Sequence, residues 1–407
     1  MRHTDAQPPL AGRAPQRPSL EVADIVRAHG EGFVRSHALT PDQQDVLRDI
    51  ARCRTAELGG HIDECTHCGY EAPSYNSCRN RHCPKCQGLA QFRWVTARME
   101  RMLPTHAFHV VFTLPRELRR LALANRSAVF NLLFACVADT LITLGRDGRR
   151  LGGDLGVTSV LHTWQRDLRW HPHVHCIVTG GGLSQDGQRW IAARPDFLFP
   201  VRVMGALFRG KMLDALRRAR EHGMLKFTGP AAPLADPERF DALCLKLSKK
   251  RWVVYCKPPF GDSEQVFRYL GQYTHRVGIS NHRLVSLDDH GVTFRTRGDD
   301  KVTLAPDEFL RRFVLHVLPK GFVKIRHHGL FAPSHVGTKL AAARKLLGGK
   351  PPAPKPEPAP PPTDFRDYML ALTGVDLRRC RRCGAFALIR RPLEHLCPAV
   401  PAALDTS

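Results

Sequence analysis

The chain has 407 residues, of which 43% are hydrophobic, so it can form two or three domains with sizeable cores. This composition excludes a disordered or fibrous protein. Its 61 lysines and arginines exceed its 38 acidic residues, and the resulting charge of +23 suits a polyanionic partner bound with salt-sensitive affinity. The alternative is a basic protein without a specialised partner.

Residues 1–20 are rich in proline, arginine and glutamine and lack an apolar segment, which predicts a flexible arm and no signal peptide. We expect no segment long and apolar enough to cross a bilayer, and therefore a cytoplasmic protein without a membrane partner. In that reducing compartment the 13 cysteines are thiols or metal ligands. Four of them are expected to be ordinary core residues, namely Cys136, Cys176, Cys244 and Cys256.

A zinc-binding, DNA-binding domain is predicted over residues 21–100, beginning with a helical pattern over 21–50. Two C-x-x-C knuckles, separated by fourteen residues, predict one tetrahedral zinc ion held by Cys65, Cys68, Cys83 and Cys86. Four further residues surround the knuckles and either form a second site or are simply buried: Cys53, His61, Cys78 and His82. His67 and His82 are rivals for individual ligand positions.

Basic residues flank the zinc core and predict contacts with DNA, with aromatic residues between them. The predicted contacts are Arg79, Arg81 and Lys85, joined by Lys257 and Arg276 from later in the chain. The alternative is a structural zinc domain with a solvated basic face.

An α+β sheet domain is predicted over residues 101–346. Strands are expected at 108–114, 157–164, 173–178, 252–256, 292–296, 301–304 and 322–325, with helices at 116–144, from 262 onward, and at 309–318. The strands 157–164 and 173–178 are expected to form a hairpin. Residues 347–364, dominated by proline, predict a linker. Residues 365–407 then offer a small module with four zinc ligands, Cys380, Cys383, His395 and Cys397.

A metal site is predicted at the run 171–175, where histidines alternate with other residues. On a strand, His173 and His175 share one face, and we expect Val174 and Ile177 to pack on the other. His162, on the preceding strand, is the favoured third ligand. Weaker candidates are His171, Gln165 and Gln272, the amides suiting Mg²⁺ or Mn²⁺. The alternative is the polar face of a surface strand.

Two tyrosines, Tyr269 and Tyr273, are four residues apart in the helix expected from residue 262. They would present two phenols on one helix face, roughly 5–6 Å apart. A phenol can attack a phosphodiester, but its pKa of about 10 requires activation. The alternative is that both rings pack as part of the apolar stripe of the helix.

Four stretches in matching order, over about residues 20–335, resemble the rolling-circle insertion-sequence transposases of bacteria, within the endonucleases named after a His-hydrophobe-His motif. They are residues 74–86, 171–175 with 180–182, 255–260 and 269–281. The resemblance implies a palm-like antiparallel sheet with flanking helices, preceded by a small zinc-binding domain. It also implies His173 and His175 as the metal-binding pair and Tyr269 and Tyr273 as paired nucleophiles.

The function implied by the resemblance is nicking and rejoining of single-stranded DNA at element ends through a 5′-phosphotyrosine, near the nucleoid. A replication initiator of a plasmid or phage, with the same chemistry, is one alternative. A catalytically inactive, zinc-dependent DNA-binding regulator is another, although a pure binder needs neither the histidine pair nor the tyrosines. No Walker-type Gly-Lys-Ser/Thr loop occurs, so any unwinding would come from a host helicase and replication proteins.

Overall fold

The computed structural model describes residues 18–86, 88–99, 101–257, 278–348, 366–367, 369–370 and 374–393. The chain divides into two compact units. The first combines Met1–Gly88, Ser280–Leu310 and Lys355–Ser407, and the second combines Leu89–Ile279 and Arg311–Pro354. The first unit is therefore assembled from three separated segments, whereas the sequence predicts a continuous zinc-binding domain over 21–100.

Two helices open the first unit, α1 (Val22–Ser36) and α2 (Pro41–Arg52), as the helical pattern over 21–50 predicts. Thr40 caps α2: its side chain accepts from the Gln43 N–H, while the Gln43 side chain accepts from the Thr40 N–H. The apolar faces of the two helices bury Ile25, Phe33 and Ile50.

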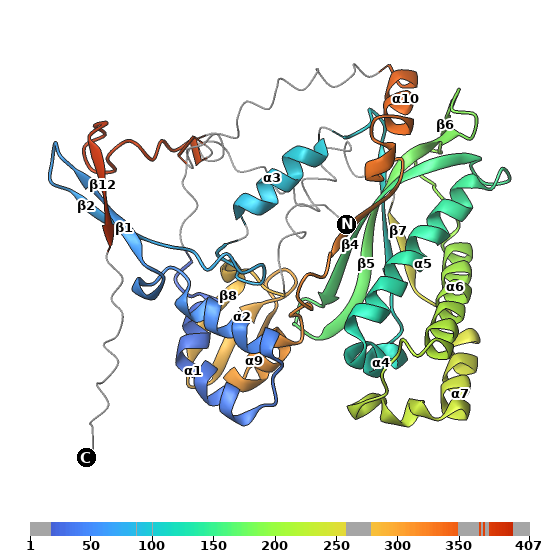
Figure 1. Ribbon diagram of the computed structural model, residues 1–407, viewed down its shortest axis with the longest axis horizontal. Helices are drawn as coiled ribbons and strands as arrows, with labels where there is room; N and C mark the ends of the chain where they lie inside the picture. Colours follow the sequence, from blue (N-terminus) through green and yellow to red (C-terminus); the bar gives the residue numbers. More distant parts are fainter. Residues whose placement is uncertain are drawn as a thin grey trace, which may run out of the picture. The chain divides into compact units, whose positions relative to one another are not determined.

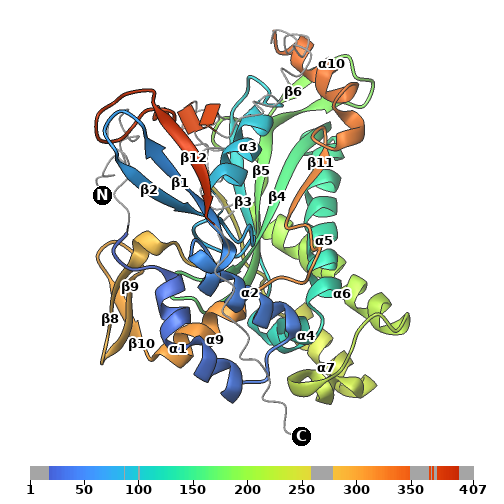
Figure 2. The same ribbon diagram turned by 60° about the vertical axis from the view of Figure 1, so that its left-hand side comes forward.

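Two three-stranded antiparallel sheets complete the first unit, with strand orders β12-β1-β2 and β10-β9-β8 (Figure 2). The first consists of β1 (Gly60–Cys65), β2 (Glu71–Tyr75) and β12 (Leu388–Leu393). The second consists of β8 (Leu284–Asp288), β9 (Gly291–Arg295) and β10 (Lys301–Leu304), followed by α9 (Pro306–Val314). The strands predicted at 292–296 and 301–304 are confirmed as β9 and β10, which pair with each other.

The second unit is built on an antiparallel sheet of order β11-β4-β5-β3-β7, with β6 added to β5 (Figure 1). Its strands are β3 (Ala107–Thr113), β4 (Gly153–Trp164), β5 (Trp170–Ser184), β6 (Trp190–Ala192), β7 (Val254–Lys257) and β11 (Ile325–Gly329). The pairing of β4 with β5 confirms the predicted hairpin, which is longer at both ends than the sequence indicates. The expected mixture of helices and antiparallel strands is thus confirmed.

Helices cover one face of this sheet and form the main core with it (Figure 1). They are α4 (Arg119–Ala124), α5 (Arg126–Arg146), α6 (Val201–Glu221) and α7 (Pro237–Ser248). Phe112 of β3 meets Phe208 of α6 edge to face, with ring centroids 5.2 Å apart. On the other face, Trp94 of α3 (Gly88–Met99) packs against Ala107 and Ile177. A last helix, α10 (Lys339–Leu346), follows β11.

The single helix predicted over 116–144 is interrupted at Asn125. This buried amide donates to the carbonyls of Leu121 and Lys226, at 3.0 and 2.7 Å, and accepts from the Lys226 N–H at 2.6 Å. Because the side chain tethers a distant loop, the backbone at Asn125 leaves helical geometry and separates α4 from α5.

Among the described residues, one helix is long and apolar enough, by composition, to cross a membrane. It is α5, so the expectation that no segment meets this criterion is wrong. In this structure α5 packs against α6 and β4, and 61% of its most apolar window is buried. Its apolar composition is that of a core helix.

Candidate active site and metal centres

Three histidines gather on the sheet face opposite the core helices. His162 of β4 pairs directly with His173 of β5, and His175 lies two residues further along β5. The ring centroids of His162 and His175 are 4.3 Å apart, and those of His173 and His175 are 4.8 Å apart. One ring nitrogen from each lies within 4.8 Å of the others, so the structure brings the two predicted ligands together with the favoured third.

Burial keeps the imidazoles of His173 and His175 neutral. Burial lowers the pKa of His173 to about 4 and that of His175 well below its usual value. His173 Nδ1 lies 2.6 Å from the carbonyl of His171, which can only accept, so Nδ1 carries the proton and Nε2 keeps its lone pair. Neutral imidazoles with an available lone pair are the form that binds a metal ion.

A fourth histidine, His109 of β3, contacts this group and was not singled out from the sequence. Its Nε2 lies 2.8 Å from His175 Nδ1, and the two rings stack with centroids 5.0 Å apart. The available signal was a single histidine within the apolar strand predicted at 108–114. The role of this histidine follows only from the pairing register of β3 with β5, which puts His109 and His175 on the same face of the sheet.

The other predicted ligands lie outside the three-histidine group. The His171 Nδ1 lies 3.1 Å from an Arg119 guanidinium nitrogen, and Gln165 lies in the turn between β4 and β5. The expectation that Ile177 packs on the opposite face is wrong. Ile177 is two residues from His175 and therefore shares its face, whereas Val174 packs in the core as expected.

Strand β7 leads toward the predicted nucleophiles. Its residues Tyr255 and Lys257 pair with Val111 and His109 of β3, so both side chains belong to the histidine face of the sheet. Both are exposed, and the Lys257 ammonium lies 6.0 Å from the centroid of the Tyr255 ring. Residues 258–277 lie outside the described residues, and with them Tyr269, Tyr273, Gln272 and Arg276.

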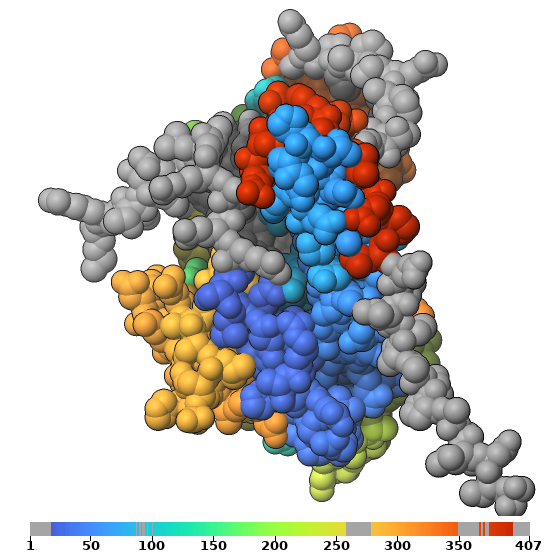
Figure 3. All heavy atoms as spheres, turned by 90° about the vertical axis from the view of Figure 1, so that its left-hand side faces the viewer, coloured from blue at the N-terminus to red at the C-terminus, as the bar shows by residue number. Residues whose placement is uncertain are grey.

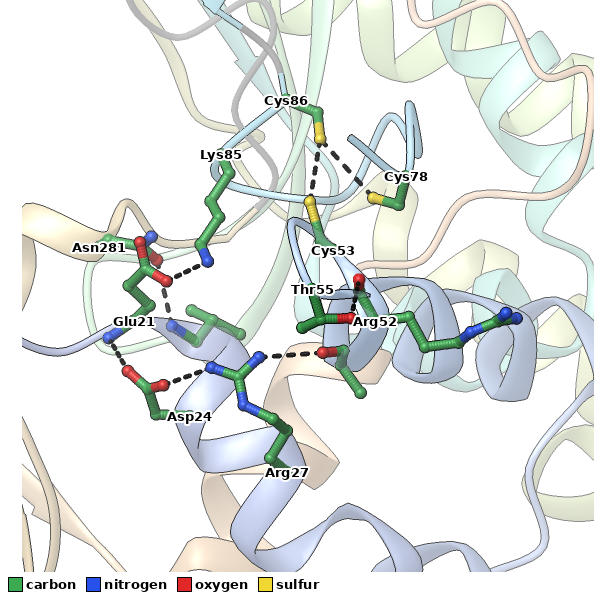
Figure 4. Close-up of polar contacts among 12 residues, drawn as sticks. Glu21, Asp24, Arg27, Arg52, Cys53, Thr55, Cys78, Lys85, Cys86 and Asn281 are labelled. Atoms are coloured by element: carbon green, nitrogen blue, oxygen red, sulfur yellow. Dashed lines mark hydrogen bonds and ion pairs between the residues drawn. The ribbon is translucent and has the colours of Figure 1, made fainter. Parts of the chain in front are cut away.

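The first cysteine cluster in the other unit contains Cys53, Cys78, Cys83 and Cys86. Figure 4 shows three of the sulfurs converging, with Cys86 Sγ 3.3 Å from Cys53 Sγ and 3.6 Å from Cys78 Sγ. Tetrahedral zinc at about 2.3 Å from each sulfur places neighbouring sulfurs roughly 3.8 Å apart. The hydrogen bond between Cys78 and Cys53 is the main cause that lowers the pKa of Cys53 to about 7, and it raises the pKa of Cys78.

The second cluster contains Cys65, Cys68, Cys380 and Cys383. The predicted grouping of Cys65 and Cys68 with Cys83 and Cys86 around one ion therefore differs from the structure. The physical reason is the β1–β2 hairpin. Cys53 and Cys78 flank its open end and Cys65 lies at its turn, so a six-residue strand of roughly 17 Å separates the two knuckles.

The remaining predicted zinc ligands lie outside both clusters or outside the described residues. His82 is buried, with its Nδ1 3.2 Å from the Asn80 side-chain oxygen. His61 lies 3.6 Å from Asp63. His395 and Cys397 are outside the described residues. The two four-cysteine clusters suggest two zinc ions.

The predicted DNA contacts of the first unit differ in accessibility. Arg79 is exposed, whereas Arg81 is half-buried and burial lowers its pKa. Lys85 is not on the exposed basic face: it forms a largely buried ion pair with Glu21, which precedes α1 (Figure 4). The Lys85 charge is therefore used in an ion pair within this unit.

Comparisons with known proteins agree with this geometry. Residues 156–339 match the family described as a putative transposase, and residues 25–114 match a transposase zinc-binding domain. The putative transposase y4qJ of Sinorhizobium fredii is 44% identical over 398 residues, which cover 96% of this chain and 100% of that protein. The chain belongs to the IS91 family of transposases.

A second transposase relative, that of insertion sequence element IS801 from Pseudomonas savastanoi pv. phaseolicola, is 29% identical over 350 residues. This match covers 84% of the present chain and 82% of that protein. No solved structure matches the chain. The transposase match contains the three histidines, and the zinc-binding match contains the first cysteine cluster. Cys380 and Cys383 lie beyond both matches.

Proposed function

We propose that this transposase cuts and rejoins single-stranded DNA at the ends of its element through a tyrosine nucleophile. The group formed by His162, His173 and His175 on the open face of an antiparallel sheet carries this proposal. The membership in a transposase family supports DNA as the substrate. A palm-like sheet, in which the segment that carries the nucleophiles follows β7 in the chain, accords with this proposal. We further propose that the reaction takes place at the bacterial nucleoid.

The three histidines fit a catalytic divalent cation. Ligands about 2.1 Å from one ion lie roughly 3–4 Å apart, and the three ring nitrogens lie within 4.8 Å of one another. His173, His175 and His162 would hold Mg²⁺ or Mn²⁺ and leave positions for phosphate oxygens. When bound, such an ion neutralises charge that develops on the scissile phosphate.

The reaction that we propose conserves the energy of the phosphodiester. The phenol oxygen of Tyr269 or Tyr273 bonds to phosphorus, the bond from phosphorus to the 3′ oxygen breaks, and that oxygen leaves as a hydroxyl with a proton. In the joining step a 3′-hydroxyl attacks the phosphotyrosine and returns the proton to the phenol. Two tyrosines permit two successive transfers.

Exposed residues on the histidine face would hold the DNA strand. Lys257 suits a phosphate contact, and the exposed ring of Tyr255 suits stacking on a base. The first unit, by itself, would offer the exposed Arg79 as a phosphate contact. These roles are proposals that rest on exposure, charge and the fold.

A covalent adduct tests the proposed function directly. The full chain is incubated with single-stranded oligonucleotides from both ends of the element and Mn²⁺, then separated on a denaturing gel. We expect a protein–DNA adduct with the parent, and none with the double variant Tyr269→Phe/Tyr273→Phe. Each single variant should block a different transfer step.

The matched control is Tyr255→Phe, which keeps the aromatic ring proposed to stack on a base and removes only the hydroxyl of a tyrosine outside the predicted helix. It should keep the adduct. An adduct of undiminished yield in the double variant would contradict the assignment of the tyrosines.

We further propose that His109 is a positioning residue for His175. Its nitrogen, 2.8 Å from His175 Nδ1, fixes the orientation of that ring and directs Nε2 toward the shared site. Loss of such a partner typically lowers metal affinity about 10–100-fold. We therefore expect His109→Ala to weaken Mn²⁺ binding by that factor in titration calorimetry.

His109→Gln provides the matched control, because its amide can still hydrogen-bond to Nδ1 of His175. We expect it to recover part of the Mn²⁺ affinity. Zinc content and thermal unfolding should stay unchanged in both variants. Equal Mn²⁺ affinity in His109→Ala and the parent would rule out a positioning role.

A further inference from the structure

The segment 378–393 is far from the β1–β2 hairpin in sequence, but its last six residues, strand β12, belong to the same sheet of the first unit. β12 pairs antiparallel with every residue of β1, from Gly60 opposite Leu393 to Cys65 opposite Leu388. Beyond the ladder, the Thr66 N–H and hydroxyl both donate to the Ala387 carbonyl, at 2.9 and 3.2 Å. β1 is therefore the central strand of its sheet. In Figure 3 the red C-terminal residues lie on both sides of the light-blue hairpin.

The second cysteine cluster consists of two C-x-x-C knuckles, Cys65–Cys68 and Cys380–Cys383. Both knuckles have the same backbone geometry. In each, the first cysteine donates its N–H to the carbonyl five residues on and accepts from a glycine N–H four residues on, at 2.8–2.9 Å. Those glycines, Gly69 and Gly384, both adopt the left-handed conformation, with φ of 68° and 76°. Cys65 and Cys380 thus occupy equivalent positions in two matching half-sites.

The sulfur separations indicate a metal and exclude a disulfide. Cys65 Sγ lies 3.7 Å from Cys383 Sγ, and Cys68 Sγ lies 3.7 Å from Cys380 Sγ. A disulfide requires about 2.05 Å. Four thiolates around zinc at about 2.3 Å have edges of roughly 3.8 Å. Each knuckle supplies only two of the four ligands that a structural zinc site needs.

Charge complementarity matches the segment to this hairpin. The hairpin carries acidic side chains, and β12 carries two arginines that meet them. Arg390 lies 3.0 Å from Asp63, while Arg391 lies 2.7 Å from Glu64 and 2.6 Å from Glu71. Such partly exposed pairs contribute little stability. They do favour β12 as the partner strand, because without it Asp63, Glu64 and Glu71 would lose their arginine partners.

We propose that the second zinc site is a split site, in which Cys65 and Cys68 provide one half and Cys380 and Cys383 the other. Its metal acts as a clasp that holds residues 378–393 on the β1–β2 hairpin. The first cluster is a separate site with all four ligands between residues 53 and 86. This inference does not depend on strand cleavage, because zinc content and fragment retention are measured without DNA.

Zinc content in three variants of the full chain tests the split site. The variants are Cys65→Ser/Cys68→Ser, Cys380→Ser/Cys383→Ser, and the quadruple combination. The parent should contain two zinc ions and each of the three variants one, because all three lose the same ion. Independent sites in the two parts of the chain would instead give one, one and none, which would overturn the proposal. Cys256→Ser, outside both clusters, should keep two.

A second measurement uses the native cysteines. A specific protease site is inserted between Pro354 and Lys355, and the cleaved protein is passed over a sizing column. The fragment bearing Cys380 should co-elute with the remainder in zinc and separate after chelation. Co-elution that persists when zinc analysis shows the metal removed would overturn the clasp.

Discussion

Replacing His173 by alanine is expected to lower strand cleavage by at least about 1,000-fold while DNA affinity changes little. The cation at this site is proposed to supply several kcal/mol of charge stabilisation, and each 1.4 kcal/mol corresponds to a factor of ten in rate. His173 contributes its Nε2 lone pair from the centre of the sheet, where the neighbouring strand offers His162 directly opposite. Single-turnover cleavage of an end oligonucleotide, alongside a gel shift with the same oligonucleotide, measures both quantities.

The matched control is His222→Ala. This exposed histidine follows α6 in the same unit, and its ring Nδ1 lies 2.7 Å from the carbonyl of Arg218. It should cleave at the parental rate. Cleavage by His173→Ala within about threefold of the parent would contradict the metal assignment, and parallel loss of DNA binding would point to a folding defect instead.

Replacing Cys83 by serine is expected to release the zinc of the first cluster and unfold the segment around it. Cys83 is buried among three other thiols that join the end of α2 to the loop after β2. Structural zinc contributes about 10–16 kcal/mol in small zinc-binding peptides, which matches or exceeds the whole stability of a typical domain. Zinc analysis should show one ion lost, and limited proteolysis should cut within residues 53–86.

The second unit has its own core and should remain folded in this variant. We expect a separate thermal transition for it, close to that of the parent. Cys136→Ala, which removes a buried thiol of α5 outside both clusters, serves as the control for cysteine loss. Unchanged zinc content in Cys83→Ser would contradict this ligand set.

The histidine group could be predicted because its geometry is local. Alternation along one strand places His173 and His175 on a face, and a hairpin of adjacent segments brings His162 opposite them. The contribution of His109 depends on which strand lies on the other side of β5. That order is set by packing of the whole sheet and has no signal in the spacing of residues.

The partition of the cysteines could not be predicted for the same reason. Spacing within 65–86 suggests one compact site, and nothing in that stretch shows that its intervening residues form a hairpin. β1 itself reads Gly-His-Ile-Asp-Glu-Cys and lacks an alternating apolar pattern. Its partner strand β12 is distant in the sequence, since Cys65 and Cys383 of the second cluster are 318 residues apart. Only the folded chain brings these ligands together.

The pairing of β1 with β12 orders events during synthesis. A ribosome that adds about 5–20 residues per second needs roughly 15–60 s between finishing the hairpin and finishing its partner strand. The second unit, which needs no residue beyond 354, can fold during that interval. A polypeptide terminated before Cys380 would contain the histidine site yet lack half of the second cysteine cluster. Premature products of the gene would thus carry the three-histidine face without a finished first unit.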